Sequence, residues 1–454
     1  MPGPQPGHPA PIPAAIAAAL SPYPDAPVLL AISGGRDSVV LMHAAAALVA
    51  ERATVVHVDH GLHPRSAHWA SEVSQQAESL GLACVTLSVD ARPSEGEGPE
   101  AAARNARYAA LASVMRAGAC LVTAHHRRDQ AETVLLQLLR GAGPDGLAAM
   151  PADTAFAGGR HLRPLLDIAD GALAAYAARH EVRWEEDPSN ASDDANRNFL
   201  RHQVMPRLQQ RWPGAEAALA RSAALCAESA RRDRLLATED LGEALIAAAL
   251  PLSALVGLAE DRQRNALRAW LALRGVRPPP RNRLLSFMDA VANGAPDRHP
   301  RMAWGEHELA RFRGALHLLP RLQLPAAGHS WDWDGRAALE LGDSFGRLRL
   351  EPDGVGLDPA VLDGPLRVAL RGGGERIHPV GQGQRRALKS LLREAGCPPW
   401  LRQRLPLLFR GDELLAAGPW WIAAEHAVDR GGLRVVWDLG GSLQVPDVTR
   451  PSSA

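Results

Sequence analysis

The sequence predicts an α/β protein, with an N-terminal domain built on a parallel β-sheet, then a helical domain, then a small α+β domain. Between residues 28 and about 190, short apolar runs alternate with segments of helical periodicity. This pattern is typical of β-α-β units that form a mostly parallel sheet with helices on both faces. The runs are continuously apolar, as expected of strands buried on both faces. The length of 454 residues exceeds one ordinary core and suggests about two to four domains.

The elements of the first domain follow in order. Strands are expected at VLLAIS (28–33), ATVVHVDH (53–60), ACVTLSV (83–89) and ACLVTAHH (119–126). Helices are expected at 37–51, 68–81, 99–118 and 129–141. Ligands of such sheets bind beyond the carboxyl ends of the strands, so the candidate site segments are 33–38, 59–63 and 125–132.

The rest of the chain changes in texture. Residues 191 to about 320 are rich in alanine and arginine at helical spacing, 321–365 are richer in proline and glycine, and 366–437 regain strand-like and helical runs. The predicted organisation is a disordered segment at 1–24, a catalytic domain at 25–213, a helical domain at 214–325, a linker at 326–365, an α+β domain at 366–437 and a tail at 438–454.

Composition narrows the classes of function. Lys plus Arg and Asp plus Glu each number 50, so any attraction to a polyanion must come from local basic surfaces. The four cysteines form no CxxC pair and no disulfide framework. No apolar run approaches the roughly 18 residues of a membrane span, so a cytoplasmic protein without membrane contact is expected. Whether the chain forms a homodimer stays open.

The turn SGGRDS, residues 33–38, follows the first expected strand and opens a helix. Its glycines allow backbone N–H groups to converge on an anion at a helix N-terminus. The alternative is an ordinary strand-to-helix turn with an Asp or Ser cap. The only lysine is Lys389 and no GxGxxG follows the strand, which excludes the two better-known phosphate loops. The residues expected to hold the phosphates are Ser33, Gly34, Gly35, Arg36, Asp37 and Ser38.

Asp37 is an acidic group beside this expected phosphate site. A carboxylate there makes chemical sense when a divalent cation lies between it and the phosphates, so we expect Mg²⁺ at Asp37. A turn of the form SGGxDS after a first strand resembles the PP-loop of the N-type ATP pyrophosphatases. That resemblance implies that the turn holds the pyrophosphate of ATP for adenylyl transfer.

Further motifs narrow the resemblance within that superfamily. Seven further segments together resemble the tRNA(Ile)-lysidine synthetase family. They are VDHGLHPRS, PEAAARNARY, TAHHRRDQAETVLLQLLRGAGPDGLAAM, RPLL, WEEDPSNASDDANRNFLRHQVMP, GGGERI and LKSLLREAGCPPWLRQRLPLL. The resemblance implies that ATP and Mg²⁺ activate C2 of the wobble cytidine in the CAU anticodon of an isoleucine tRNA. The ε-amine of free L-lysine then attacks, and lysidine, AMP and pyrophosphate are the products.

This chemistry needs a carboxylate that anchors the ε-ammonium and accepts its proton. Glu100, Asp129 and Glu132 are candidates by position, against the alternative that the acids only complement a helix dipole. Arg104 and Arg107, three residues apart on one helix face, are expected to reach a phosphate, although both could be solvated surface. Further nucleotide-binding candidates are Asp59, His60 and His125, and a merely structural histidine is the alternative for His125 and His126.

One position departs from the family pattern. The family carries HHxDDQ where this chain has His125-His126-Arg127-Arg128-Asp129-Gln130. Arg128 therefore reverses the charge of a carboxylate. If the family's carboxylate holds Mg²⁺ or lysine, this reversal of charge impairs the site. If the start of the helix is rotated, Arg128 can contact phosphate instead. We expect Arg128→Asp to retain or raise activity.

The segment 366–410 carries ten basic side chains against two acidic ones, a local excess that fits contact with tRNA phosphates. The alternative is general arginine richness. Trp400 is a candidate for packing or stacking. The expected tRNA-binding residues are Arg197, Arg201, Arg376, Arg385, Arg386, Lys389 and Arg402.

Three other functions remain as alternatives. A tRNA thiolase of the same loop class would need catalytic or cluster-binding cysteines. A small-molecule synthetase of the amidotransferase type would leave the basic C-terminal segment without a role. An RNA-binding protein with an inactive nucleotide site would release no pyrophosphate from ATP.

Overall fold

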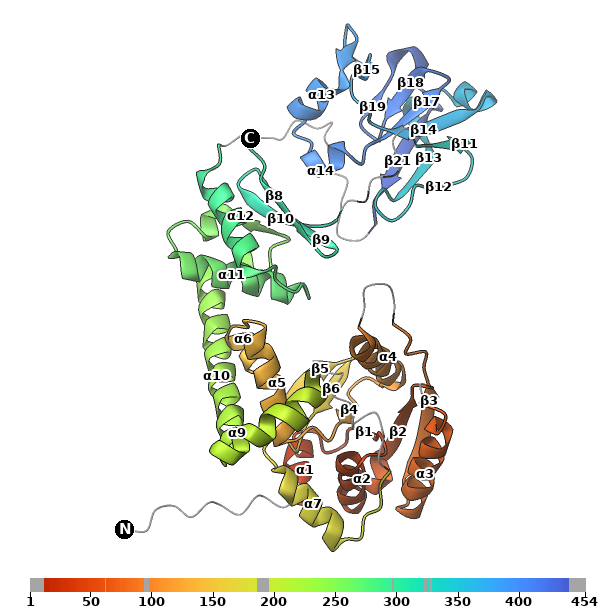
Figure 1. Ribbon diagram of the computed structural model, residues 1–454. Coiled ribbons are helices and arrows are strands. Elements are labelled where there is room, and N and C mark those ends of the chain that lie inside the picture. Colours follow the sequence, from red (N-terminus) through yellow and green to blue (C-terminus); the bar gives the residue numbers. More distant parts are fainter. Residues whose placement is uncertain are drawn as a thin grey trace. The chain divides into compact units, whose positions relative to one another are not determined.

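The computed structural model describes residues 12–61, 63–93, 98–185, 196–295, 298–321, 323, 325 and 329–440. The chain divides into two compact units, Met1–Asp233 and Arg234–Ala454 (Figure 1). Within the described ranges, no helix combines the length and the apolar character that a membrane crossing requires.

The first unit is built on a six-stranded sheet in the order β3-β2-β1-β4-β6-β5. Its strands are β1 (Val28–Ala31), β2 (Ala53–Asp59), β3 (Ala83–Ser88), β4 (Cys120–Val122), β5 (Asp153–Phe156) and β6 (Gly159–Leu162). All neighbours pair in parallel except the edge strand β5, which runs antiparallel to β6. The predicted α/β fold with a parallel sheet is confirmed.

Helices cover both faces of this sheet (Figure 1). They are α1 (Ile12–Leu20), α2 (Arg36–Val49), α3 (Ser66–Ser79), α4 (Pro99–Val114), α5 (Arg127–Leu139), α6 (Pro144–Leu147) and α7 (Asp170–Arg179). Leu30 and Val55 are buried in one core cluster, whereas the next residue along β2, Val56, is buried in another together with Leu111 of α4. Successive strand residues point to opposite faces, so burial of both explains the continuously apolar runs.

The N-terminal segment differs from its prediction. Residues 12–20 form α1, whose apolar side chains Ile12, Ile16 and Leu20 are buried in the core beside α2. The prediction of disorder at 1–24 is therefore wrong for residues 12–24. Three apolar side chains at helical spacing lie on one face of the helix, and their burial stabilises the folded segment. Residues 1–11 lie outside the described part of the chain.

After α7, the described chain resumes with α8 (Asn196–Phe199), a π-helical turn (Leu200–Val204) and α9 (Met205–Arg211). The long helix α10 (Ala215–Leu241) then runs from the first unit into the second.

The second unit begins with α11 (Glu260–Leu273) and α12 (Arg281–Asn293) beside a four-stranded antiparallel sheet. Its strands are β7 (Ala249–Pro251), β8 (Arg301–Trp304), β9 (His307–Phe312) and β10 (Ala315–Pro320). Trp270 of α11 shares a core with Leu309 and Leu316 of the sheet. The prediction that 214–325 is helical is incomplete, because this segment also contains the four strands. Helical periodicity dominates its sequence and hides them. The turn between β9 and β10 depends on only two residues, Arg313 and Gly314, which have positive φ.

The segment predicted as a linker is also folded. It contains β11 (Ser330–Trp333), β12 (Leu339–Glu340) and β13 (Arg347–Leu357), of which β11 pairs with β14 (Leu366–Leu370) and β13 with β21 (Leu433–Asp438). Trp333 and Leu348 are buried in the core of the C-terminal part. Antiparallel partners many residues away decide such strands, and local composition does not reveal them. The predicted tail lies, from residue 441 on, outside the described residues.

The remaining elements of the second unit complete this C-terminal part. They are β15 (Arg376–Ile377), β16 (Arg386–Ala387), α13 (Leu388–Glu394), α14 (Pro399–Arg402), β17 (Pro406–Arg410), β18 (Glu413–Ala417), β19 (Trp421–Ile422) and β20 (Ala427–Val428). The α+β character expected for 366–437 agrees with these elements.

Candidate active site

The SGGRDS turn connects β1 to the first turn of α2. Gly34 has φ +93°, and a Cβ atom there would lie 3.3 Å from Val73 Cγ2, so both backbone conformation and packing favour glycine. Ser38 Oγ accepts a hydrogen bond from the Ser33 N–H (3.2 Å) and donates one to the Gly35 carbonyl (2.8 Å). No side chain caps α2 at Gly35, so the N–H groups of its first turn remain available to an anion.

A cavity of about 510 Å³ opens beside this turn. It lies at the carboxyl ends of β1, β2 and β4, as expected for a parallel sheet. Eight of the predicted site residues line it: Ser33, Asp37, Ser38, Asp59, His60, Arg107, His125 and Asp129. Arg104 is placed differently, with its guanidinium carbon 4.9 Å from the centre of the Tyr108 ring. Sequence reasoning missed Trp69 and Tyr108, whose aromatic side chains also line the cavity.

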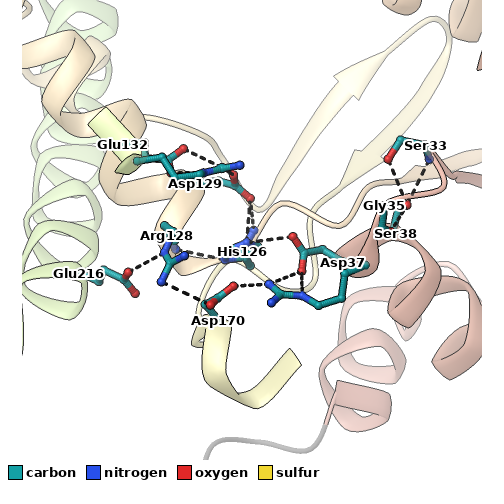
Figure 2. A network of polar contacts seen from close by, with 12 residues as sticks. Ser33, Gly35, Asp37, Ser38, His126, Arg128, Asp129, Glu132, Asp170 and Glu216 are labelled. Carbon is teal, nitrogen blue, oxygen red and sulfur yellow. Dashed lines mark hydrogen bonds and ion pairs between the residues drawn. The ribbon is translucent and has the colours of Figure 1, made fainter. Parts of the chain in front are cut away.

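Asp37 is an ionised carboxylate at the edge of the cavity (Figure 2). Arg36 donates to its Oδ1 at 2.8 Å, and His126 Nε2 lies 3.3 Å from its Oδ2. Burial by itself raises the pKa of Asp37, but the hydrogen bonds and charges of His126 and Arg36 outweigh burial and lower the pKa to about 2. Arg36 also binds Asp170. Its guanidinium is thus engaged with two carboxylates.

A magnesium ion fits this carboxylate. Asp37 offers the carboxylate oxygen that Mg²⁺ prefers. Asp170 lies with Asp37 and His126 in a group whose ligand atoms are within 4.8 Å of one another, but its two oxygens are paired with Arg36 and Arg128. The His126 ring is a donor to Asp37, so it orients the carboxylate and does not itself bind the ion. Asp37 therefore remains the residue expected to hold Mg²⁺.

Arg128 lies between two carboxylates from distant parts of the chain (Figure 2). Its Nε is 3.0 Å from Glu216 Oε1 on α10, and its Nη2 is 3.3 Å from Asp170 Oδ2 on α7. This placement directs Nε and Nη2 of Arg128 to carboxylates and not to a phosphate, the contact that one reading of the sequence allowed. Neither Asp170 nor Glu216 was identified from the sequence, and no local motif marks them.

Asp129 and Glu132 of α5 are both paired with Arg197 and Arg201. Glu132 is fully buried, and the two arginines donate to its oxygen atoms at 2.8 Å each. Asp129 accepts from Arg201 at 3.0 Å and from the His126 N–H at 2.9 Å. Asp129 lines the cavity, whereas Glu132 is absent from its wall. The structure thus gives Arg197 and Arg201 carboxylate partners inside the first unit, in place of the exposed position expected of tRNA-binding residues.

Two residues that line the cavity each carry a buried donor without a partner in the described part of the protein. Arg107 Nε lies 3.3 Å from His60 Nε2, which makes that nitrogen an acceptor and places the ring proton on Nδ1. Burial and the charge of Arg107 lower the pKa of His60. His60 Nδ1 and Trp69 Nε1 are buried and, among the described groups, unpaired. Unpaired buried donors are costly, so they fit a site that receives a polar ligand such as ATP.

The basic residues of the C-terminal part fall into two groups. Arg404 is 1% exposed and binds backbone carbonyls, and Arg402 donates to the Cys397 carbonyl at 2.7 Å. Trp400 is buried and packs against Phe312, which leaves no face for stacking on a base. Exposed positive charge remains at Arg376, Arg385 and Lys389, whereas Arg386 is partly buried and paired with Glu394.

Comparisons with known proteins agree with this architecture. A family model described as the PP-loop domain matches residues 11–208, the TilS substrate binding domain matches 250–317, and the TilS substrate C-terminal domain matches 366–437. The chain is 45% identical to a tRNA(Ile)-lysidine synthase of Alkalilimnicola ehrlichii over 85% of this chain and 88% of that protein. It is 44% identical to one of Xanthomonas campestris over 88% and 92%. A third, from Methylococcus capsulatus, is 40% identical over 89% and 94%.

Proposed function

Because the chain belongs to the tRNA(Ile)-lysidine synthase family, we propose that it joins free L-lysine to C2 of the wobble cytidine in the CAU anticodon of an isoleucine tRNA. In the first step, the cytidine O2 attacks the α-phosphate of ATP and pyrophosphate leaves. In the second, the ε-amine of lysine attacks C2, the C2–O bond breaks and AMP leaves. The modified tRNA then reads AUA and accepts isoleucine.

The observation that carries this proposal is the cavity beside the SGGRDS turn. Its wall combines free N–H groups of α2, the ionised Asp37 and the unpaired donors of His60 and Trp69. These groups suit a triphosphate and its leaving pyrophosphate, because donors placed in advance stabilise charge as it develops. Asp37 would hold Mg²⁺, which would further neutralise the charge of the phosphates.

Asp129 is the carboxylate we assign to lysine. The ε-ammonium must lose a proton before it can attack, and Asp129 is the acid of α5 that reaches the cavity. His126 and Arg197 outweigh burial and lower the pKa of Asp129, which keeps it ionised as an anchor for the ammonium. Glu132, closed off by Arg197 and Arg201, holds those arginines in place.

The tRNA is assigned to the exposed basic residues of the C-terminal part. Arg376, Arg385 and Lys389 carry positive charge on a surface that follows β15, β16 and α13. Such charges bind phosphates without reading sequence. We therefore assign orientation of the tRNA to them, and recognition of the wobble base to the cavity of the first unit.

A tRNA thiolase is the second candidate, and the cysteines disfavour it. Cys84 and Cys120 lie in β3 and β4, do not line the cavity, and have pKa values raised by burial. Burial raises the pKa of Cys397 to about 12. A thiol in such surroundings is a poor nucleophile.

The test is incorporation of radiolabelled L-lysine into a CAU-anticodon isoleucine tRNA transcript with ATP and Mg²⁺, with AMP followed in parallel. A transcript with a GAU anticodon is the control. Label in the first tRNA with matching AMP supports the proposal. AMP without label would indicate another nucleophile, and absence of both would leave an RNA-binding protein.

A further inference from the structure

The RPLL motif begins with Arg163, whose side chain is buried and does not line the cavity. Its Nη1 donates to the Pro151 carbonyl at 2.8 Å, and its Nη2 lies 3.0 Å from His161 Nδ1. Arginine has donors only and stays protonated in proteins. His161 Nδ1 must therefore be the acceptor of this hydrogen bond.

This acceptor sets the direction of every hydrogen bond that follows. A neutral His161 with an unprotonated Nδ1 carries its proton on Nε2, which lies 3.0 Å from Thr123 Oγ1. The Thr123 hydroxyl oxygen accepts a hydrogen bond from this N–H group, and the hydroxyl has one hydrogen of its own to donate. His125 Nδ1 lies 2.8 Å from the same oxygen and is the acceptor that the described contacts offer. A hydroxyl that accepted from both rings would leave its own hydrogen buried and unpaired, which is costly.

The last member of the chain lines the active-site cavity. With Nδ1 of His125 occupied as an acceptor, the ring proton lies on Nε2. Among the described residues, none forms a hydrogen bond with that nitrogen, and the ring lies in the cavity wall together with Asp129. We propose that Arg163, His161 and Thr123 are positioning residues that hold His125 as the neutral Nε2–H tautomer, which presents a fixed donor to anionic oxygen atoms of the bound nucleotide.

The electrostatics agree with this geometry. Burial, helped by the charges of Arg163 and Arg197, outweighs the opposing charge of Asp129 and lowers the pKa of His125 to about 3. Burial, Arg163 and Arg104 lower the pKa of His161 to about 3 as well. Both rings therefore stay neutral near pH 7. A neutral N–H donor suits a phosphate oxygen because the hydrogen bond strengthens as negative charge develops on that oxygen. A charged His125 would instead form an ion pair with Asp129, which would turn the ring away from the phosphate.

The role in catalysis rests on the proposed function, but the tautomer does not, so the two can fail separately. The first measurement is a two-bond ¹H–¹⁵N correlation spectrum of the full chain labelled with ¹⁵N-histidine, recorded between pH 5.5 and 8. His125→Gln and His161→Gln assign the two rings by the loss of their signals. Both rings should appear as neutral Nε2–H tautomers that do not titrate in this range. A His125 ring that is protonated, or carries its proton on Nδ1, would overturn the proposal.

The second measurement tests Thr123, the middle member of the relay, by which we mean the hydrogen bonds that lead from Arg163 through His161 and Thr123 to His125. Thr123→Val removes the hydroxyl at nearly constant size, while Thr123→Ser keeps it. The Val variant should show a mixture of His125 tautomers and a kcat for AMP formation lowered about tenfold, with KM for lysine changed less than about twofold. The Ser variant should restore both. Thr54→Val, on β2 and outside the cavity wall, controls for loss of a strand hydroxyl.

The outcomes separate a positioning role from a merely structural one. A Val variant that loses kcat while His125 keeps its tautomer would refute the relay, because packing alone would then explain the loss. Wild-type protein that shows the Nε2–H tautomer but makes no lysidine would leave the relay intact and overturn the proposed function.

Discussion

Arg128 on α5 and Glu216 on α10 form an ion pair in which Nε and Oε1 lie 3.0 Å apart. The same guanidinium reaches Asp170, and Asp170 in turn binds Arg36 of the SGGRDS turn. Arg128 is therefore part of a chain of alternating charges that ends at Asp37 (Figure 2). A position that looked like a damaged site in the sequence is integrated into the structure.

Replacement of Arg128 by Asp should impair the enzyme, contrary to the expectation from sequence alone. The new carboxylate would face Asp170 and Glu216, and like charges in a partly buried site repel. We expect unfolding to become easier by about 2 kcal/mol and AMP formation to fall, measured by urea denaturation and by turnover. Arg140→Ala, at the C-cap of the same helix, serves as the control. The charge-swapped pair R128E/E216R should recover part of the stability, and failure of Arg128→Asp to change either quantity would contradict this account.

Asp37 should control the adenylation step. We expect Asp37→Asn to lower the rate of pyrophosphate release at least about 100-fold, a loss typical of a group that stabilises transition-state charge. Binding of tRNA, measured by filter retention, should change less than about twofold. Asp145→Asn, on α6, is a matched carboxylate outside the cavity wall. Unchanged turnover of the Asp37 variant would remove its role toward magnesium.

Asp37 should also contribute to acid stability. Its pKa is lowered from 3.8 to about 2 in the folded protein. A carboxylate with a lowered pKa stabilises the fold above its unfolded pKa and loses that contribution as pH falls through the folded pKa. The difference in unfolding free energy between wild type and Asp37→Asn should hence be constant above about pH 5 and shrink between pH 4 and 2. Denaturant titrations at these pH values test it, and a difference that grew toward acid would have the wrong sign.

Asp129 and Glu132 should fail in different ways when neutralised. Asp129→Asn should raise KM for lysine about tenfold or more, because the anchor for the ammonium is lost. Glu132→Gln should mainly destabilise the protein, because Arg197 and Arg201 would keep their charges without their buried partner. Lysine-dependent turnover and thermal unfolding of both variants distinguish these roles. Equal effects on KM would mean that Glu132 also contacts lysine.

The exposed basic residues of the C-terminal part should act through salt-dependent binding. Replacing Arg385, Arg386 and Lys389 together by Ala should weaken tRNA binding and reduce the slope of log K against log salt by about one unit per lost phosphate contact. Arg434→Ala, whose side chain pairs with Glu351, is a control from the same unit. An unchanged slope in the triple variant would show that these residues are ordinary surface.

The sequence by itself determined the features that depend on neighbours along the chain. The Ser33–Ser38 turn, the parallel sheet and the cavity at its carboxyl edge follow from local periodicity and from where glycines stand. Asp59, His60, His125 and Asp129 were found for the same reason, since each lies at the end of a strand or in the segment that follows it. Local patterns carry this information because hydrogen bonding within a turn or helix involves residues a few positions apart.

The tertiary structure alone decided which charges meet. Arg128 and Glu216 are 88 positions apart, and Arg36 and Asp170 are 134 apart, so no spacing rule could pair them. The same holds for the strands β11 to β13, which become folded only through partners such as β14 and β21. Arg197 and Arg201 belong here too, because burial beside Glu132 requires that their charges be paired. Long-range packing and the free-energy cost of an unpaired buried charge act between segments that are far apart along the chain, so local patterns cannot reveal them.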